Sequence, residues 1–228
     1  MQVPMNVSST IFREYDIRGI VGDDLTVAVA EAVGRAYATR LRRTVDRPVV
    51  AVGYDNRPSS PELADALAAG LNAAGADVRL VGTVPTPALY YAADVWATDG
   101  GIQITGSHNP PEYNGIKMIV GDRALYGAAI QELRELVESD RYADGSGSTE
   151  RHEILERYAE EIGRRAGVEG PVKMVLDCGN GTGSVIAPQA LALAGIDVDC
   201  LYCESDGTFP NHHPDPTVDK NVVDLIAR

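Results

Sequence analysis

The chain has 228 residues, of which 44% are hydrophobic, and its 33 acidic residues outnumber 20 lysines and arginines to give a formal net charge of −13. This balance excludes a nucleic-acid-binding protein that relies on a basic stripe, because no such stripe is available to neutralise phosphates. No apolar stretch approaches the roughly twenty residues that cross a bilayer. We therefore expect a soluble protein with neither nucleic-acid nor membrane partners.

The first half of the chain alternates between helix-like and strand-like patterns. Apolar residues at four-residue steps over 25–37 predict a helix. Ser60 would cap a second helix with Pro61 at its first position, and Gly75 would end that helix. We predict further helices after Thr86 and over 127–139, and buried strands at 49–52, 77–82, 101–105 and 115–120. Strands that alternate with helices at this spacing indicate an α/β layer architecture.

A polar, glycine-rich segment then precedes a second α/β pattern. A helix is expected over about 151–166, followed by strands at 172–177 and 197–202 with a glycine-rich turn and a helix between them. Two clear strands are fewer than a sheet usually has. We therefore predict a complete first domain over 1–140, a linker over 141–150, and an incomplete second domain over 151–228.

The loop TGSHNP (105–110) follows a predicted buried strand directly. In open α/β sheets, ligands bind beyond the carboxyl ends of the strands. Ser107 would display its hydroxyl on this loop beside the His108 imidazole, and Lys117 could reach the same rim. The alternatives are a solvated turn and an acyl-transfer site. An acyl-transfer site is disfavoured because G-x-S-x-G is absent and adjacent Ser and His side chains rarely align as nucleophile and base.

Six motifs follow one another along the chain. They are FREYDIRG (12–19), GYDNRPSS (53–60), TVPTP (83–87), TGSHNPPEYNGIK (105–117), DCGNGTG (177–183) and CESDGTFPNHHPDP (203–216). Together they resemble the α-D-phosphohexomutases, and the last two are similar to the bacterial phosphomannomutase/phosphoglucomutase branch of that superfamily. The resemblance implies a three-layer α/β/α domain with a mixed sheet, followed by the start of a second, similar domain.

The resemblance also implies an activity. Members of this superfamily are isomerases that interconvert hexose 1-phosphate and hexose 6-phosphate, here of mannose and/or glucose, by intramolecular phosphoryl transfer. Ser107 would carry the phosphoryl group as a phosphoserine, pass it to the sugar phosphate, and recover the other phosphate from the hexose 1,6-bisphosphate intermediate. Mg²⁺ would be bound in part by the phosphate on Ser107.

Five further residues receive roles from the same resemblance. His108 and Asn109 would orient the phosphoserine, and Lys117 would be a charge stabiliser or a general acid/base. Arg18 and Tyr15 would reach the transferring phosphate or the sugar. Because phosphoryl transfer depends mostly on positioning and charge neutralisation, an acidic protein needs its cations gathered at this point. We expect Arg18, His108 and Lys117 to face one cleft together with the serine.

Three other patterns are given less functional meaning. GNGTG (179–183) is interpreted as a tight βα turn, because it fits neither G-x-G-x-x-G nor a Walker motif. Cys200 and Cys203 lie at a strand end, where an odd spacing should point the two thiols to opposite faces. HHPD (212–215) lacks the helical frame of a metal site. An odd number of cysteines and the absence of an export signal indicate a reducing compartment, the cytoplasm.

The sequence also departs from the family. The aspartate-rich loop that supplies the three other magnesium ligands is absent from residues 1–228, as are the loops that recognise the sugar and the distal phosphate. We therefore expect the chain alone to be inactive and catalysis to belong to a longer parent protein. The alternatives are a non-catalytic module that binds sugar phosphates or a partner protein, and, more weakly, a serine hydrolase.

Overall fold

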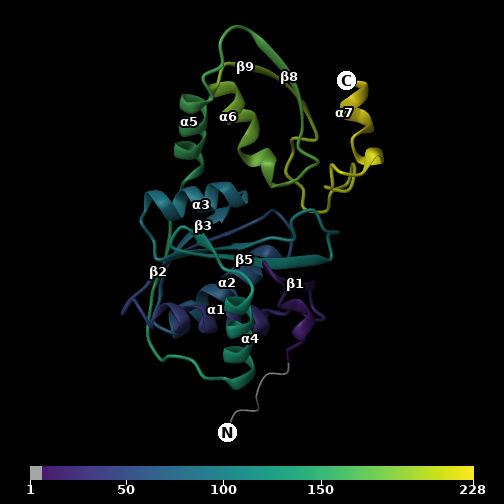
Figure 1. The fold of residues 1–228 in the computed structure, drawn as a ribbon. Helices are drawn as coiled ribbons and strands as arrows, with labels where there is room; N and C mark the ends of the chain where they lie inside the picture. The colour runs from purple at the N-terminus through teal and green to yellow at the C-terminus, as the bar shows by residue number, and fades with distance from the viewer. Residues whose placement is uncertain (1–6) are drawn as a thin grey trace.

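The computed structural model describes residues 7–228; residues 1–6, which begin the predicted first domain, lie outside the described part. The chain forms two α/β units, one above the other in Figure 1, with the end of the chain in the upper unit. Among the described residues, no helix has the length and apolar character needed to cross a membrane.

The first unit is built on one mixed sheet. Its strands are β1 (Ile17–Ile20), β2 (Val49–Tyr54), β3 (Asp77–Thr83), β4 (Gly100–Ile104), β5 (Tyr113–Val120), β6 (Arg123–Ala124) and β7 (Thr149–Arg151). They lie in the order β1-β5-β4-β2-β3-β7, and β6 pairs with β5. β4, β2, β3 and β7 are mutually parallel, whereas β5 is antiparallel to both β4 and β1. The predicted mixed sheet is confirmed.

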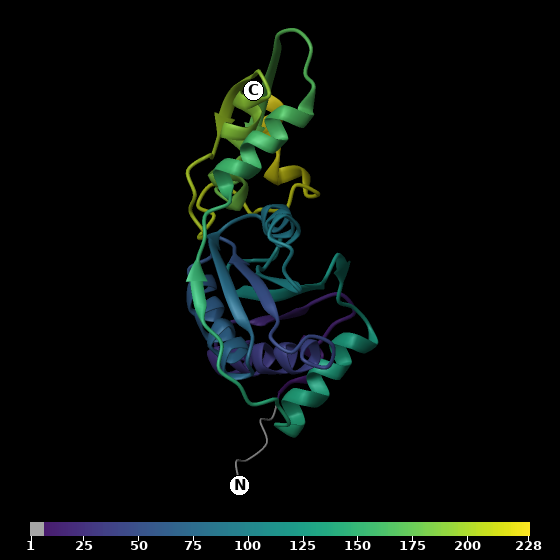
Figure 2. The same ribbon diagram turned by 90° about the vertical axis from the view of Figure 1, so that its left-hand side faces the viewer.

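Helices cover both faces of this sheet. They are α1 (Val27–Leu41), α2 (Ser60–Ala73), α3 (Thr86–Val95) and α4 (Ala128–Ser139), and a short 3-10 turn, η1 (Ser9–Ile11), precedes them. α1, α2 and α4 lie on one face and α3 on the other (Figures 1 and 2). Because strand side chains alternate, Val50 and Val52 join the core under α1 and α2, whereas Ala51 packs with α3. The three-layer α/β/α prediction is therefore confirmed.

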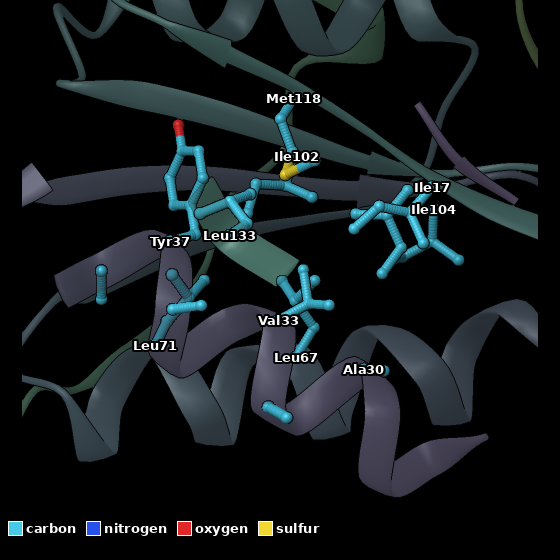
Figure 3. Close-up of a cluster of buried hydrophobic side chains, with 14 of the residues drawn as sticks. Ile17, Ala30, Val33, Tyr37, Leu67, Leu71, Ile102, Ile104, Met118 and Leu133 are labelled. Atoms are coloured by element: carbon cyan, nitrogen blue, oxygen red, sulfur yellow. The ribbon is translucent and has the colours of Figure 1, made fainter. Parts of the chain in front are cut away.

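The core under α1 and α2 is fully desolvated. Figure 3 shows Val33 and Tyr37 of α1 beside Leu67 of α2 and the sheet residues Ile102 and Ile104, and each of these five side chains is 0% exposed. Burial of large apolar side chains is the main source of stability in such a layer.

Glycine allows α1 and α2 to approach closely. A methyl group on Gly34 would collide with the carbonyl oxygen of Leu67, and one on Gly70 with that of Glu31. Protein interiors are packed too tightly to accept such a group without movement of the backbone. The two helices that support the sheet therefore depend on these glycines for their spacing.

The predicted elements agree with the observed ones except at the sheet edges. The bounds of the four buried strands differ from the predicted ones by at most two residues at either end, and those of the helices by a few residues. β1, β6 and β7 were not predicted. Ser60 was expected to cap α2, but the N-cap is Ser59 and makes no capping bond, while Ser60 donates its hydroxyl to Asp55.

The segment 141–150, which was predicted as a linker, lies against the first unit. The Gly145 amide donates to the Ala73 carbonyl at 3.1 Å, and the Gly147 amide donates to the Asn72 carbonyl at 2.9 Å. Its last two residues belong to β7, which pairs in parallel with β3. The sheet of the first unit therefore reaches as far as Arg151.

The second unit contains one pair of parallel strands. Its elements are α5 (Leu155–Ala166), β8 (Val172–Asp177), η2 (Thr182–Val185), α6 (Ala187–Leu193), β9 (Ile196–Leu201), η3 (Asp219–Asn221) and α7 (Val223–Ala227). β8 pairs with β9, and α5 packs against α6 (Figure 2). This is the predicted start of a second α/β domain.

The cysteine prediction was wrong in its geometry. Cys200 and Cys203 form a disulfide, and the Cys203 sulfur also lies 3.4 Å from that of Cys178. The strand alternation rule does not apply, because β9 ends at Leu201 and the backbone of Tyr202 turns back with φ 49°. Cys203 therefore returns toward the strand that carries Cys200.

Candidate active site

Three loops meet at the carboxyl edge of the first sheet. β2, β3 and β4 run in the same direction, so the segments after Tyr54, Thr83 and Ile104 leave the sheet at one edge. The serine loop is the last of these three segments. The prediction that it follows a buried strand is confirmed, since all five residues of β4 are buried. This edge is where ligands of open α/β sheets bind.

Ser107 has an unusual backbone conformation. Its φ is 56°, in the left-handed region that costs a residue with a side chain about 1–2 kcal/mol. The Thr105 hydroxyl accepts a hydrogen bond from the Ser107 amide at 2.9 Å. The side chain is exposed, and its Oγ lies 3.4 Å from His108 Nδ1. Surrounding bonds therefore hold the serine in a conformation that it would not choose alone.

Arg18 and Lys117 are brought to the same carboxylate. Asp16 Oδ2 accepts from Arg18 Nη2 at 2.7 Å and from Lys117 Nζ at 2.9 Å. The sheet explains this arrangement. Ile17 and Ile116 pair and face the core under α1 and α2, so the residues after them, Arg18 and Lys117, face the side of α3.

The shared carboxylate is electrostatically unusual. Burial raises the pKa of Asp16, but the hydrogen bonds from Arg18 and Lys117 outweigh this effect, so the pKa lies below its ordinary value of 3.8. Asp16 therefore remains an anion at neutral pH and fixes the positions of both cations. The expectation that Arg18 and Lys117 lie on the same side of the domain agrees with this geometry.

Asn109 and Tyr15 make contacts of their own in this structure. The Asn109 amide group donates to the Gly106 carbonyl at 2.7 Å, so it stabilises the loop from within. The Tyr15 side chain is 71% exposed, and its ring lies 6.3 Å from that of Tyr126. Neither contact reaches the Ser107 hydroxyl.

Asp55 and Arg57 lie within the motif GYDNRPSS, but the sequence predicted no role for either residue. Asp55 accepts a hydrogen bond from the Gly106 amide at 3.1 Å, and the Arg57 side chain is 0% exposed beneath the serine loop. A signal was present: two charged residues follow a buried strand directly, at the ligand-binding edge of the sheet. Charged side chains are almost never fully buried unless they are paired.

The second unit touches the first beside this loop. Asn56 Nδ2 donates to the Asn180 carbonyl at 2.7 Å, and the Asn56 amide donates to the Thr182 hydroxyl at 3.1 Å. A cavity of about 190 Å³ lies between the units, with Ser107 on one wall and Thr182 and Phe209 on the other. The segment 179–183 thus forms a turn after β8 that contacts the first unit.

His212 has a structural partner in the second unit. Its Nε2 lies 3.0 Å from Asp177 Oδ2, and its Nδ1 lies 3.0 Å from the His213 carbonyl oxygen. Burial lowers the pKa of His212, but the hydrogen bonds to His213 and Asp177 outweigh it, so the pKa is raised above 6.5. The imidazole thus ties the loop 203–216 to the end of β8.

The described residues do not form a magnesium site by themselves. Within residues 7–228, no three His, Cys, Asp or Glu side chains gather so that they could hold a metal ion. Asp16 is bonded to Arg18 and Lys117, and Asp55 is bonded to Arg57. Mg²⁺ needs six ligands in near-octahedral geometry, so a phosphate on Ser107 would provide only part of its coordination.

Two family models match the chain. The phosphoglucomutase/phosphomannomutase α/β/α domain I matches residues 9–144, and domain II matches residues 156–228. A phosphomannomutase/phosphoglucomutase from Pseudomonas aeruginosa is 50% identical, with 96% of this chain and 47% of that protein covered. A phosphoglucomutase from Neisseria meningitidis is 44% identical, with 97% and 48% covered.

A solved structure agrees with these sequence matches. The phosphoglucomutase/phosphomannomutase family protein from Burkholderia thailandensis has a TM-score of 0.92 and 42% identity, with 97% of this chain and 50% of that chain covered. The chain thus spans about half the length of the relatives that it matches. Since both domain models match in order, the chain belongs to the phosphoglucomutase/phosphomannomutase family.

Proposed function

We propose that this chain supplies the first domain, and the start of the second, of a mutase that interconverts hexose 1-phosphate and hexose 6-phosphate, of mannose and/or glucose. Ser107 is the phosphoryl carrier, and a hexose 1,6-bisphosphate is the intermediate. We extend the first domain to Arg151, because β7 belongs to its sheet. The observation that carries the proposal is an exposed, conformationally strained Ser107 at the ligand-binding edge of the sheet.

The chemistry is two in-line phosphoryl transfers. In the first, a hydroxyl oxygen of the sugar phosphate bonds to the phosphorus on Ser107 and gives up its proton, while the bond between phosphorus and the serine oxygen breaks and the serine oxygen takes up a proton. In the second, the serine hydroxyl oxygen bonds to the phosphorus of the other phosphate and gives up its proton, while the bond between that phosphorus and the sugar oxygen breaks and the sugar oxygen takes up a proton. Positioning and charge neutralisation supply most of the catalysis in such transfers.

Two cations and one imidazole on this edge suit that task. Arg18 and Lys117 share the Asp16 carboxylate, and His108 lies next to Ser107. An ammonium group held against a carboxylate is suited to stabilise negative charge or to donate a proton to the leaving oxygen, so we assign Lys117 one of these two roles. The net charge of −13 makes such local concentration necessary, because the whole protein repels anions at long range.

We propose that the phosphate on Ser107 supplies part of the Mg²⁺ coordination and that the aspartate ligands lie beyond residue 228. When bound, the ion would contact the phosphate on Ser107 and neutralise charge on the transferring group. Because the chain spans about half the length of its relatives, we also propose that the 228 residues alone do not turn over substrate.

A coupled mutase assay tests the proposal. Glucose 1-phosphate or mannose 1-phosphate is supplied with Mg²⁺ and a hexose 1,6-bisphosphate to the 228-residue chain and to the product of the complete gene. We expect turnover only from the latter, no turnover after Ser107→Ala, and slowed turnover after Lys117→Ala with Ser107 still phosphorylated. Ser139→Ala, at the far end of α4, is the matched control and should be as active as the parent.

Two results would contradict this function. The first is full turnover by the Ser107→Ala protein, which would remove the phosphoryl carrier from the mechanism. The second is binding of sugar phosphates without turnover by the product of the complete gene, which would favour the non-catalytic binding module. Ester hydrolysis that depends on Ser107 would instead favour the serine hydrolase.

A further inference from the structure

Every donor of the Arg57 side chain is used beneath the serine loop. Nε donates to Asp55 Oδ2 at 3.1 Å. Nη1 donates to the carbonyls of Pro110 at 2.7 Å and Tyr113 at 3.2 Å, and Nη2 donates to those of Ser107 at 3.0 Å and Asn109 at 2.7 Å. A guanidinium has five N–H groups in a rigid fork, so no donor is left over.

The serine loop is folded around this one group. Four carbonyls between Ser107 and Tyr113 converge on the guanidinium, in a segment that has no helix or strand of its own until β5 begins. Carbonyls that are partly removed from water need partners, and Arg57 supplies one to each of these four; the Pro110 carbonyl also accepts from the Tyr113 amide at 3.0 Å. Lysine offers three donors from a single point and cannot reproduce the fork.

The Arg57 guanidinium also helps to fix the backbone conformation of Ser107. Arg57 Nη2 holds the Ser107 carbonyl, while the Thr105 hydroxyl holds its amide, so the residue with φ 56° is fixed from both sides. The preceding residue must be glycine, because a Cβ on Gly106 would lie 2.5 Å from Arg57 Nε and Cζ. The strained carrier residue and the buried arginine are therefore one structural unit.

The second domain also reaches Arg57. The Phe209 ring centroid lies 5.1 Å from Arg57 Cζ, within the range of a cation–π interaction. A Cβ on Gly207 would lie 2.7 Å from Arg57 Cα, so the loop 203–216 passes directly over this residue. Arg57 thus contacts the serine loop through its donors and the second domain through the face of its guanidinium.

We propose that Arg57 is the positioning residue of the serine loop, and that Phe209 couples the placement of the second domain to the backbone of Ser107. Arg57 makes no contact with the Ser107 hydroxyl among its described bonds, so it acts through the loop and not on the reacting atoms. This inference rests on the proposed phosphoryl-carrier function of Ser107.

The test measures the phosphoryl-transfer step separately from binding. The product of the complete gene and its Arg57→Lys variant are mixed with saturating glucose 1,6-bisphosphate, and the rate of Ser107 phosphorylation is followed by rapid quench and mass spectrometry. Misplacement of reacting groups by about 1 Å costs on the order of a hundredfold in rate, so we expect a loss of at least about tenfold. The dissociation constant for glucose 1-phosphate should change by less than about twofold, because the affinity does not depend on the angle of the serine.

The matched control is Arg42→Lys. Arg42 also donates to backbone carbonyls, of Ala74 at 3.4 Å and Asp144 at 2.7 Å, but at a site that contacts neither the serine loop nor the second domain. Its transfer rate should equal that of the parent. A merely structural role of Arg57 would lower the folding midpoint of Arg57→Lys and leave the transfer rate of the folded variant unchanged.

Phe209→Leu tests the link to the second domain, and decides the proposal alone if Arg57→Lys does not fold. We expect a slower transfer rate, by about threefold or more, since one cation–π contact contributes at least roughly that factor. An unchanged rate in folded Arg57→Lys, or in Phe209→Leu, would overturn the corresponding half of the proposal. Failure of the unsubstituted protein to become phosphorylated on Ser107 would instead refute the proposed function.

Discussion

Replacing Asp16 with asparagine removes the carboxylate that Arg18 and Lys117 share. One substitution then weakens two charge-assisted hydrogen bonds, of 2.7 and 2.9 Å, and leaves two cations beside a neutral amide. Such bonds contribute about 1.5–3 kcal/mol each when they are shielded from water. The side chains of Arg18 and Lys117 are 19% and 28% exposed, so solvent screens part of the loss. We expect the free energy of unfolding at pH 7 to fall by about 2 kcal/mol.

The same carboxylate gives this loss a defined pH dependence. The pKa of Asp16 in the folded protein is lowered from 3.8, because the bonds from Arg18 and Lys117 outweigh the effect of burial. A group with a depressed pKa adds stability above its unfolded pKa, and this contribution is lost as the pH falls through the folded pKa. The difference in the free energy of unfolding between the parent and Asp16→Asn should therefore have its full size at pH 7. It should shrink as the pH approaches 3.8 and vanish below the folded pKa.

Urea unfolding followed by tryptophan fluorescence measures this difference. Trp96 is the single tryptophan of the chain and caps the end of α3, so it reports on the first domain. Asp122→Asn is the control, because the Asp122 side chain is 96% exposed and its removal should leave stability unchanged. The reasoning fails if Asp16→Asn is as stable as the parent at pH 7, or if the difference keeps its size below pH 3.8.

Two further substitutions test the packing and the second domain. Gly70→Ala should lower the free energy of unfolding by about 1–3 kcal/mol in urea, because the added methyl meets the Glu31 carbonyl. Gly183→Ala is the control, because a methyl group there meets no atom within 4 Å and should leave the stability unchanged. His212→Asn should lower the thermal midpoint most below pH 6.5. The raised pKa of His212, due to its hydrogen bonds to His213 and Asp177 acting against burial, stabilises the fold there, and that contribution is lost as the pH rises through the folded pKa. An effect that grows with pH would contradict this assignment.

The central strands of the fold were readable from sequence because their signals are local. β2 and β4 are continuous buried runs, and each is followed by turn residues that end the strand. β1 and β7 could not be read in this way. β7 is exposed along its whole length, and β1 contains an arginine and a glycine, so both are strands only because a neighbouring strand pairs with them.

In the candidate site, too, features with a local signal could be predicted, whereas features that depend on distant pairing could not. The serine loop could be placed because it directly follows a buried strand, whereas the role of Asp16 depends on the pairing of β1 with β5, across 101 residues of sequence from Asp16 to Lys117. The role of Arg57 was missed for a related reason. Besides Asp55, its partners are backbone carbonyls 50 to 56 residues away, so the charged pair after a buried strand did not reveal what Arg57 binds. The Cys200–Cys203 bond was missed because it depends on the left-handed turn at Tyr202.

The most direct measurement is the site of phosphorylation itself. The product of the complete gene is incubated with Mg²⁺ and glucose 1,6-bisphosphate, and the intact protein and its peptides are then analysed by mass spectrometry, alongside the Ser107→Ala variant. We predict one added phosphate, on Ser107 alone, which is removed when glucose 6-phosphate is supplied in excess. A phosphate on another residue, or equal phosphorylation of Ser107→Ala, would contradict the claim that Ser107 is the phosphoryl carrier.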